Sequence, residues 1–326
     1  MKKQLLIFGL LVFSAASLSA QSNYQDTTKH YSFQVNYWFN LHHFLWLESF
    51  MNVSKDSTII SQTLSKVSQK KLDISLAYYR EKLASQDLRT SDYMTEFKHW
   101  ITKGDNDLSM VPSEFQAHVD MLKNVSDIYQ KYFWPSHEKS CINSIKENIG
   151  LIRKTEEKFV DEITTLTRQF WQSEKLKVDV TYVGKATKWN PRNLPYTSLF
   201  PTHVVMNTVG TNDTKGNWIE LLYHESAHHL ILSNSYFIGG TLNDIGEVMD
   251  VKLPRQLGHS YLFYFTGQLT KKLLEESSVS YPSTYMERNG IFSKYYPYLD
   301  VHLKAYMNRE VTLTEASESI IKDLQE

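Results

Sequence analysis

One ten-residue stretch, Leu221 to Leu230, constrains the fold more than any other, because it must be helical for its polar residues to act together. It reads LLYHESAHHL and contains the pattern His-Glu-x-x-His. Residues four apart lie one above the other on one face of an α-helix, so His224 and His228 can both face a single Zn²⁺. Glu225 flanks that face, where it can take a proton from an attacking water and pass it to a leaving amine.

The surrounding residues favour a metal helix over a chance match among the 12 histidines of the chain. Apolar residues recur at helical spacing from Trp218 to Leu230. Gly216-Asn217 ends the preceding loop and offers an N-cap. Upstream, residues 203–207 (HVVMN) predict a short strand. This order of strand, loop and helix resembles that of zincin peptidases, and we therefore predict a zinc site.

The first 20 residues have the three parts of a secretory signal peptide. Lys2-Lys3 is basic, residues 5–13 are apolar, and small residues precede Ala20. We expect cleavage after Ala20 and a secreted or periplasmic protein. No cysteine follows the expected cut, which argues against a lipid anchor, and no later apolar run of about 18 residues predicts a membrane span.

The charge and cysteine content argue against several kinds of partner and framework. A formal net charge of −1 predicts neither a nucleic-acid partner nor an anionic membrane partner. Cys141 is the only cysteine, so no internal disulfide can form. The fold must then rest on a hydrophobic core, which 326 residues with 41% hydrophobic content can build. The sequence leaves the oligomeric state open.

Hydrophobic spacing predicts a mostly α protein of the α+β class. Residues 21–29 are polar and predict disorder, and residues 31–51 predict a short strand followed by a buried helix. In that helix, Asn40, His42 and His43 have two interpretations, satisfied core groups or residues that line the metal cleft. Further helices are predicted at 58–72, 73–86, 91–103, 113–133 and 139–174.

At Leu176 the hydrophobic period changes from 3.6 to 2. Strands are predicted at 177–184 and 203–208, a proline-rich loop at 185–201, and helices at 242–251 after Gly239-Gly240, from Pro254 to Glu276, and near 313–324. We therefore expect a mainly helical part, 21–175, packed on a zincin-like metal-binding core, 176–326. The two parts can form separate domains or one continuous domain.

A catalytic zinc usually has three protein ligands and one open position. Glu247 lies 19 residues after His228, a spacing that resembles gluzincin peptidases of the thermolysin and aminopeptidase N type. Asp244 and Asp250 fall in the same window, which weakens that signal. His259, near the start of the following helix, is the alternative, and we favour it over Glu247 as the third ligand.

A wider set of segments resembles an uncharacterised family of secreted bacterial zincin-like proteins. The segments are Asn40-Leu-His-His-Phe, Trp134-Pro-Ser-His137, Val178-Asp-Val, Tyr196-Thr197, Pro201-Thr-His203, the metal motif, Leu257-Gly-His259-Ser-Tyr-Leu-Phe-Tyr264-Phe-Thr-Gly267 and Tyr298-Leu-Asp300. In that family a segment resembling Leu-Trp-His-Ala-x-x-Phe-Tyr-Thr-x-Gly follows the metal helix, which implies a role for His259. This chain departs from it at Gly258, where Trp is usual, and at Gln268, where Glu is common.

These residues predict a secreted zinc-dependent hydrolase, most simply a metallopeptidase acting on a peptide or other amide substrate. Glu225 would act as general base and then acid, and Tyr264 or Tyr196 would stabilise the oxyanion. One alternative is a non-catalytic secreted binding protein with a structural or relic zinc site. Another is a zinc hydrolase that cleaves a non-peptide amide, such as cell-wall material. A fourth protein ligand would favour the structural site, and an open position facing a groove would favour catalysis.

Overall fold

The computed structural model describes residues 24–50, 64–103, 107–185, 194–199, 202–210, 215–230 and 237–325. The predicted signal peptide at 1–20 lies outside these residues. The expected fold class is confirmed, because the described chain is mostly helical and carries one small mixed sheet. None of the described helices is both long enough and apolar enough to cross a bilayer.

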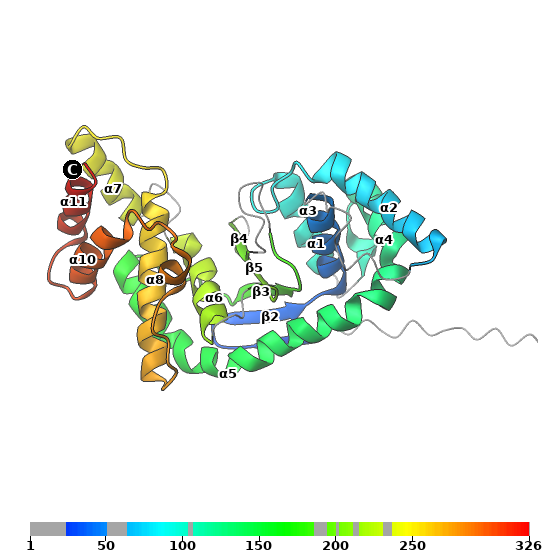
Figure 1. The fold of residues 1–326 in the computed structure, drawn as a ribbon, viewed down its shortest axis with the longest axis horizontal. Coiled ribbons are helices and arrows are strands. Elements are labelled where there is room, and N and C mark those ends of the chain that lie inside the picture. Colours follow the sequence, from blue (N-terminus) through cyan, green and yellow to red (C-terminus); the bar gives the residue numbers. More distant parts are fainter. Residues whose placement is uncertain are drawn as a thin grey trace, which may run out of the picture.

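Five strands form the sheet at the centre of the molecule (Figure 1). They are β1 (Tyr24–Thr27), β2 (Tyr31–Val35), β3 (Leu176–Thr181), β4 (Tyr196–Leu199) and β5 (Thr202–Asn207), in the spatial order β1-β2-β3-β5-β4. The inner strands β2, β3 and β5 run parallel, and the outer strands β1 and β4 pair antiparallel with them. Phe33, Val178 and Val204 lie side by side across the parallel strands, all fully buried, as expected for a sheet covered by helices.

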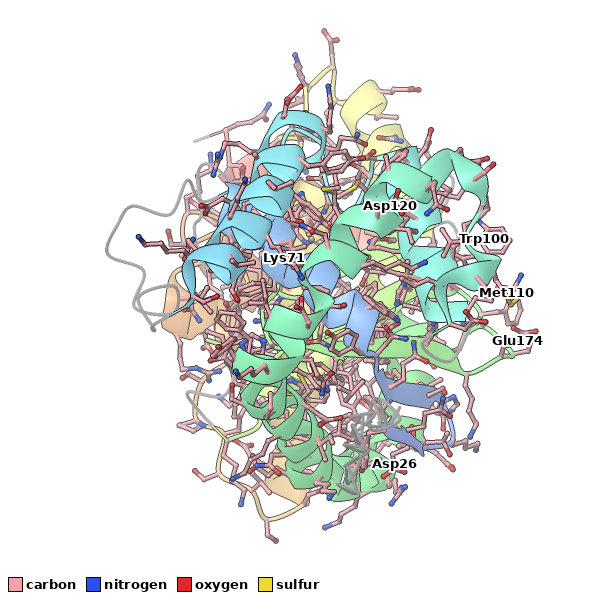
Figure 2. All side chains as sticks on the ribbon, turned by 90° about the vertical axis from the view of Figure 1, so that its right-hand side faces the viewer. Asp26, Lys71, Trp100, Met110, Asp120 and Glu174 are labelled. Atoms are coloured by element: carbon pink, nitrogen blue, oxygen red, sulfur yellow. The ribbon has the colours of Figure 1, made fainter. Side chains whose placement is uncertain are left out.

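The first group of helices forms a lobe above the sheet in Figure 1. It contains α1 (Tyr37–Phe50), α2 (Lys66–Tyr78), α3 (Asp92–Lys103) and α4 (Gln116–Tyr132), with short helical turns at 79–83, 108–110 and 113–115. Figure 2 looks onto this lobe, where Lys71 on α2 and Asp120 on α4 project from the helices. Lys71 forms an exposed ion pair with Asp127, which agrees with solvated outer faces and adds little stability.

The second group of helices forms the other lobe, joined to the first by α5 (Trp134–Thr167), which runs along the lower edge of both (Figure 1). It contains α6 (Asn217–Ala227), α7 (Phe237–Val248), α8 (Leu257–Glu276), α9 (Tyr285–Asn289), α10 (Tyr296–Met307) and α11 (Leu313–Asp323), with the short 3₁₀ turn η4 (His228–Leu230) after α6. Helix α6 packs on β5, α5 and α8, so it connects the sheet to this lobe. The predicted split at residue 176 passes through the sheet, since β1 and β2 precede it and β3 to β5 follow it.

Several predicted helix boundaries are wrong. The helix expected at 139–174 is α5, which begins at Trp134 and ends at Thr167. The break expected between residues 72 and 73 is absent, because Leu72, Leu76, Tyr79 and Leu83 continue one buried face through α2 and the π-helical turn after it. Gly239-Gly240, expected to end a loop, lies inside α7, where Ile238, Leu242 and Ile245 keep a buried helical stripe.

Two strands were not predicted. Residues 24–27, expected to be disordered, form the outer strand β1, and part of the expected loop at 185–201 forms the outer strand β4. An edge strand needs backbone pairing on one side only, and these four-residue segments carry too few alternations to stand out in the sequence.

Candidate metal centre

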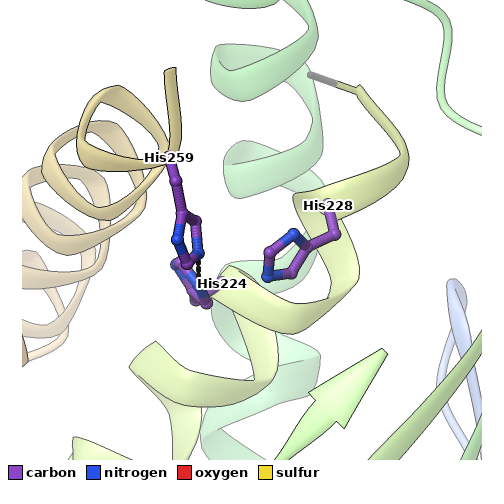
Figure 3. Close-up of side chains that lie close together, drawn as sticks. All are labelled: His224, His228 and His259. Atoms are coloured by element: carbon purple, nitrogen blue, oxygen red, sulfur yellow. Dashed lines mark hydrogen bonds between the residues drawn. The ribbon is translucent and has the colours of Figure 1, made fainter. Parts of the chain in front are cut away.

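The metal motif lies where α6 ends and η4 begins. Helix α6 begins at Asn217, directly after Gly216, so the predicted helix start is confirmed. Gly216 has a φ of 91°, which residues with a side chain rarely adopt. His224 and Glu225 lie in the last turn of α6, and His228 opens η4. The rings of His224 and His228 lie 4.8 Å apart between centroids (Figure 3). The helical spacing therefore places both imidazoles on one side of this helix end.

Helix α8 carries His259 to the same place. The Nε2 atoms of His259 and His224 lie 3.3 Å apart, and one nitrogen from each of His224, His228 and His259 lies within 4.8 Å of the others (Figure 3). Gly267 explains how α8 comes so close to α6, because a Cβ there would lie 3.0 Å from a carboxylate oxygen of Glu220 on α6. The approach of the two helices builds the cluster.

One separation in this cluster matches that expected around a tetrahedral metal ion. Two nitrogens bound to one Zn²⁺ at about 2.0–2.1 Å and at the tetrahedral angle are separated by about 3.3–3.4 Å. The observed 3.3 Å between His224 and His259 matches that separation. His228 Nδ1 is buried and has no hydrogen-bond partner among the described residues.

The electrostatics keep the three imidazoles neutral, the form that binds metals. Burial lowers the pKa of His224 and of His228 well below the usual value, and burial together with the Arg89 charge lowers the pKa of His259 to about 4. His259 Nδ1 lies 3.3 Å from Gln256 Oε1. Because Gln256 Oε1 can only accept, this contact places the proton of His259 on Nδ1. The lone pair of His259 is then on Nε2, the nitrogen that faces His224.

Glu225 lies beside the histidines, with Oε2 at 3.6 Å from His228 Nε2. The Thr197 hydroxyl, on β4, lies 2.9 Å from that Oε2 and 2.7 Å from the Glu225 carbonyl oxygen, and its one proton serves both acceptors. Burial raises the pKa of Glu225 to about 7, although Thr197 and the charges of Arg89 and Lys185 oppose the rise. The carboxyl group is thus held in place at the edge of the cluster.

The cluster opens onto two hollows. The first, about 470 Å³, is lined by the three histidines with Glu225, Arg89, Lys185, Leu194, Pro195, Tyr196, Leu221, Phe263, Tyr285, Asn289, Gly290 and Ile291. The second, about 530 Å³, lies against His228 and His259 and is bounded mainly by residues 253–258. Arg89 lines both. No local sequence pattern links Arg89, Lys185 or Phe263 to the motif.

Of the two candidates for the third ligand, the structure brings His259 to the motif. Glu247 is exposed near the end of α7, and it is not part of the cluster. Among the described residues, the cluster has no fourth His, Cys, Asp or Glu.

The two candidate oxyanion tyrosines differ in position, and neither offers a free hydroxyl proton. Tyr264 does not line the first hollow, and its hydroxyl donates to Asp300 at 3.0 Å. Five residues after His259, it is rotated by about 140° around α8, whereas Phe263 shares the face of His259. The expected role of Tyr264 is therefore corrected. Tyr196 lines the hollow, but its hydroxyl lies 2.8 Å from His43 Nε2.

The polar groups of α1 belong to the core. His43 Nδ1 lies 2.8 Å from the Phe39 carbonyl, so Nδ1 carries the proton and Nε2 accepts from Tyr196. His42 binds the Tyr79 hydroxyl at 3.0 Å, and Asn40 donates to the Val180 carbonyl at 3.1 Å. The structure favours the core position over the metal cleft, because these groups are buried and do not line the first hollow. They are not all satisfied, since His42 Nε2 is buried and has no hydrogen-bond partner among the described residues.

The comparisons with known proteins add no relative to this picture. No family model matches the chain, and no curated protein or solved structure matches it. The resemblance to zincin-like proteins therefore stays a prediction, and the residues of the site carry the functional argument.

Proposed function

We propose that this protein is a secreted, zinc-dependent hydrolase that cleaves peptide bonds. His224, His228 and His259 would hold the ion, and Glu225 would handle the proton. The observation that carries the proposal is the meeting of three buried or half-buried neutral imidazoles beside a fixed carboxyl group at the wall of a hollow of about 470 Å³.

The donor set favours zinc over the hard cations. Three imidazole nitrogens suit Zn²⁺ and its transition-metal neighbours, whereas Mg²⁺ and Ca²⁺ prefer oxygen ligands. Three protein ligands leave one position open, which is the arrangement of catalytic sites, whereas structural sites have four. The three-membered cluster among the described residues thus supports a catalytic site over a structural one.

When bound, zinc would supply a Lewis acid for the scissile carbonyl and would lower the pKa of water. Glu225 would accept a proton from the attacking water and return it to the leaving amine. Thr197 would hold the carboxyl group of Glu225 in the orientation for both steps, because the Thr197 hydroxyl contacts both Oε2 and the backbone carbonyl oxygen of Glu225. Phe263, whose ring lies 3.8 Å from that of His224 between centroids, would keep bulk water from this ligand.

The test combines metal analysis with substrate profiling. The protein should hold close to one zinc ion per chain and cleave members of a broad peptide library. Glu225→Gln should retain the zinc and the folded state and lose hydrolysis, because the amide keeps the size of the side chain and cannot accept the proton. Full turnover in Glu225→Gln would exclude this carboxylate as the base. Zinc binding without cleavage of any peptide or other amide would instead favour the non-catalytic binding protein.

A further inference from the structure

Arg89 is a cation at the site whose charge no contact with a described residue neutralises. It lines both hollows beside the histidine cluster and is exposed to them and to solvent. Its guanidinium makes no hydrogen bond or ion pair with any residue that the structure describes. An arginine fork presents several N–H donors in one plane and matches the two oxygens of a carboxylate.

The turn that carries Arg89 is fixed against the site. Asp87 Oδ1 accepts hydrogen bonds from the backbone N–H groups of Arg89 at 2.7 Å and Thr90 at 3.2 Å, and Leu88 between them is fully buried. Asp87 Oδ2 pairs with the Lys185 ammonium. Lys185 in turn exchanges two backbone hydrogen bonds with Leu194, which also lines the first hollow. The backbone of Arg89 is therefore held in place, and only its side chain can move.

The charges around the two hollows leave an excess of positive charge. Among the described residues that line them, Arg89, Lys185 and Arg255 are cations and Glu225 is the one acid. Lys185 is neutralised by Asp87, and a zinc ion would add two further positive charges. A substrate with a negative group would enter this site with favourable electrostatics, and a cationic one would be repelled.

We propose that Arg89 binds a carboxylate of the substrate and so selects peptides that carry a negative group near the bond to be cleaved. This inference rests on the proposed function, because it assigns the substrate class of the same site. The carboxylate has two possible sources, the free C-terminus of a peptide and the side chain of an internal Asp or Glu. Both present the same planar pair of oxygens to the guanidinium.

The experiment compares three matched peptides on the zinc-loaded protein. One ends in a free carboxylate, the second is its C-terminal amide, and the third is an amide with an internal Glu in place of Gln. We expect the wild-type protein to prefer at least one carboxylate peptide over the plain amide by roughly ten-fold in kcat/KM, the size of a charge-assisted hydrogen bond. Arg89→Ala should remove that preference, so that the three peptides are cleaved with equal kcat/KM. The comparison is made between peptides within each protein, because the loss of the Arg89 charge also raises the pKa of Glu225 and so changes the rate on every peptide. The preferred peptide identifies the source of the carboxylate.

Two control variants and a binding measurement complete the design. Arg89→Lys should recover only part of the preference, since it keeps the charge and loses the fork. Arg80→Ala, an exposed arginine that lines neither hollow, should behave as wild type. Binding of the same peptides to Glu225→Gln by calorimetry reports on recognition without turnover.

The outcomes separate this inference from the proposed function. Hydrolysis with equal kcat/KM for all three peptides, unchanged in Arg89→Ala, overturns the carboxylate assignment and leaves the hydrolase intact. Carboxylate-dependent binding that Arg89→Ala abolishes, without hydrolysis by the wild type, supports the assignment and overturns the hydrolase. A preference for either carboxylate peptide that survives in Arg89→Ala overturns the role of Arg89.

Discussion

Replacing His259 by alanine should release the metal, whereas replacing Glu247 by alanine should not. His259 brings its Nε2 to 3.3 Å from that of His224, and Glu247 is exposed on α7 and not part of the cluster. Four-ligand zinc sites bind with about 10–16 kcal/mol, which is roughly 3–4 kcal/mol per ligand. His259→Ala should therefore weaken zinc binding by about two to three orders of magnitude. Glu247→Ala should stay within about two-fold of wild type.

The assay is competition with a chelator of known affinity, for both variants side by side. His259 is only half-buried, and its ring contacts Gln256 and His224 by hydrogen bonds, so its removal should leave the fold intact. Circular dichroism of the metal-free variants checks this point. Gln256→Ala should cause a smaller loss, of roughly 10–100-fold, because Gln256 orients the ligand without binding the ion. Release of zinc by Glu247→Ala alone, with His259→Ala at wild-type affinity, would refute the assignment.

Three further predictions follow from contacts at and below the site. Thr197→Val should keep the zinc and lower kcat by roughly ten-fold, because the Thr197 hydroxyl orients Glu225. Thr197→Ser keeps the hydroxyl and should recover the wild-type kcat. Equal kcat in the wild type and both variants would exclude this role. Tyr264→Phe should have a kcat within about two-fold of wild type, since the Tyr264 hydroxyl donates to Asp300. A hundred-fold loss of kcat would show that Tyr264 stabilises the oxyanion after all. Burial lowers the pKa of His43 to about 3, so this neutral imidazole contributes stability above about pH 6.5 that is lost progressively as the pH falls towards 3. In urea titrations between pH 6 and 4, His43→Gln should reduce the pH slope of the unfolding free energy by about 1.4 kcal/mol per pH unit, and an unchanged slope would contradict the buried neutral state.

The features that the sequence determined by itself are those that depend on neighbours along the chain. The placement of His224 and His228 on one side follows from helical spacing. Gly216-Asn217 predicted the start of α6 because these residue types end loops and cap helices, and α6 begins at Asn217. The alternation at residues 177–181 predicted β3, and Pro254 predicted the helix that begins at Leu257. These signals are local, since each is set by the geometry of a single element.

The tertiary structure alone decided which side chains from different elements meet. His259 and Glu247 were both candidates for the third ligand, Glu247 from its spacing and His259 from its place in the next helix and the family resemblance. The packing of α8 against α6 at Gly267 brought only His259 to the motif. Arg89 lies more than 130 residues before the motif, so no spacing rule connects it to the site. The distance between two helix faces depends on the volumes of all the side chains packed between them, and a pattern along one helix does not contain that information.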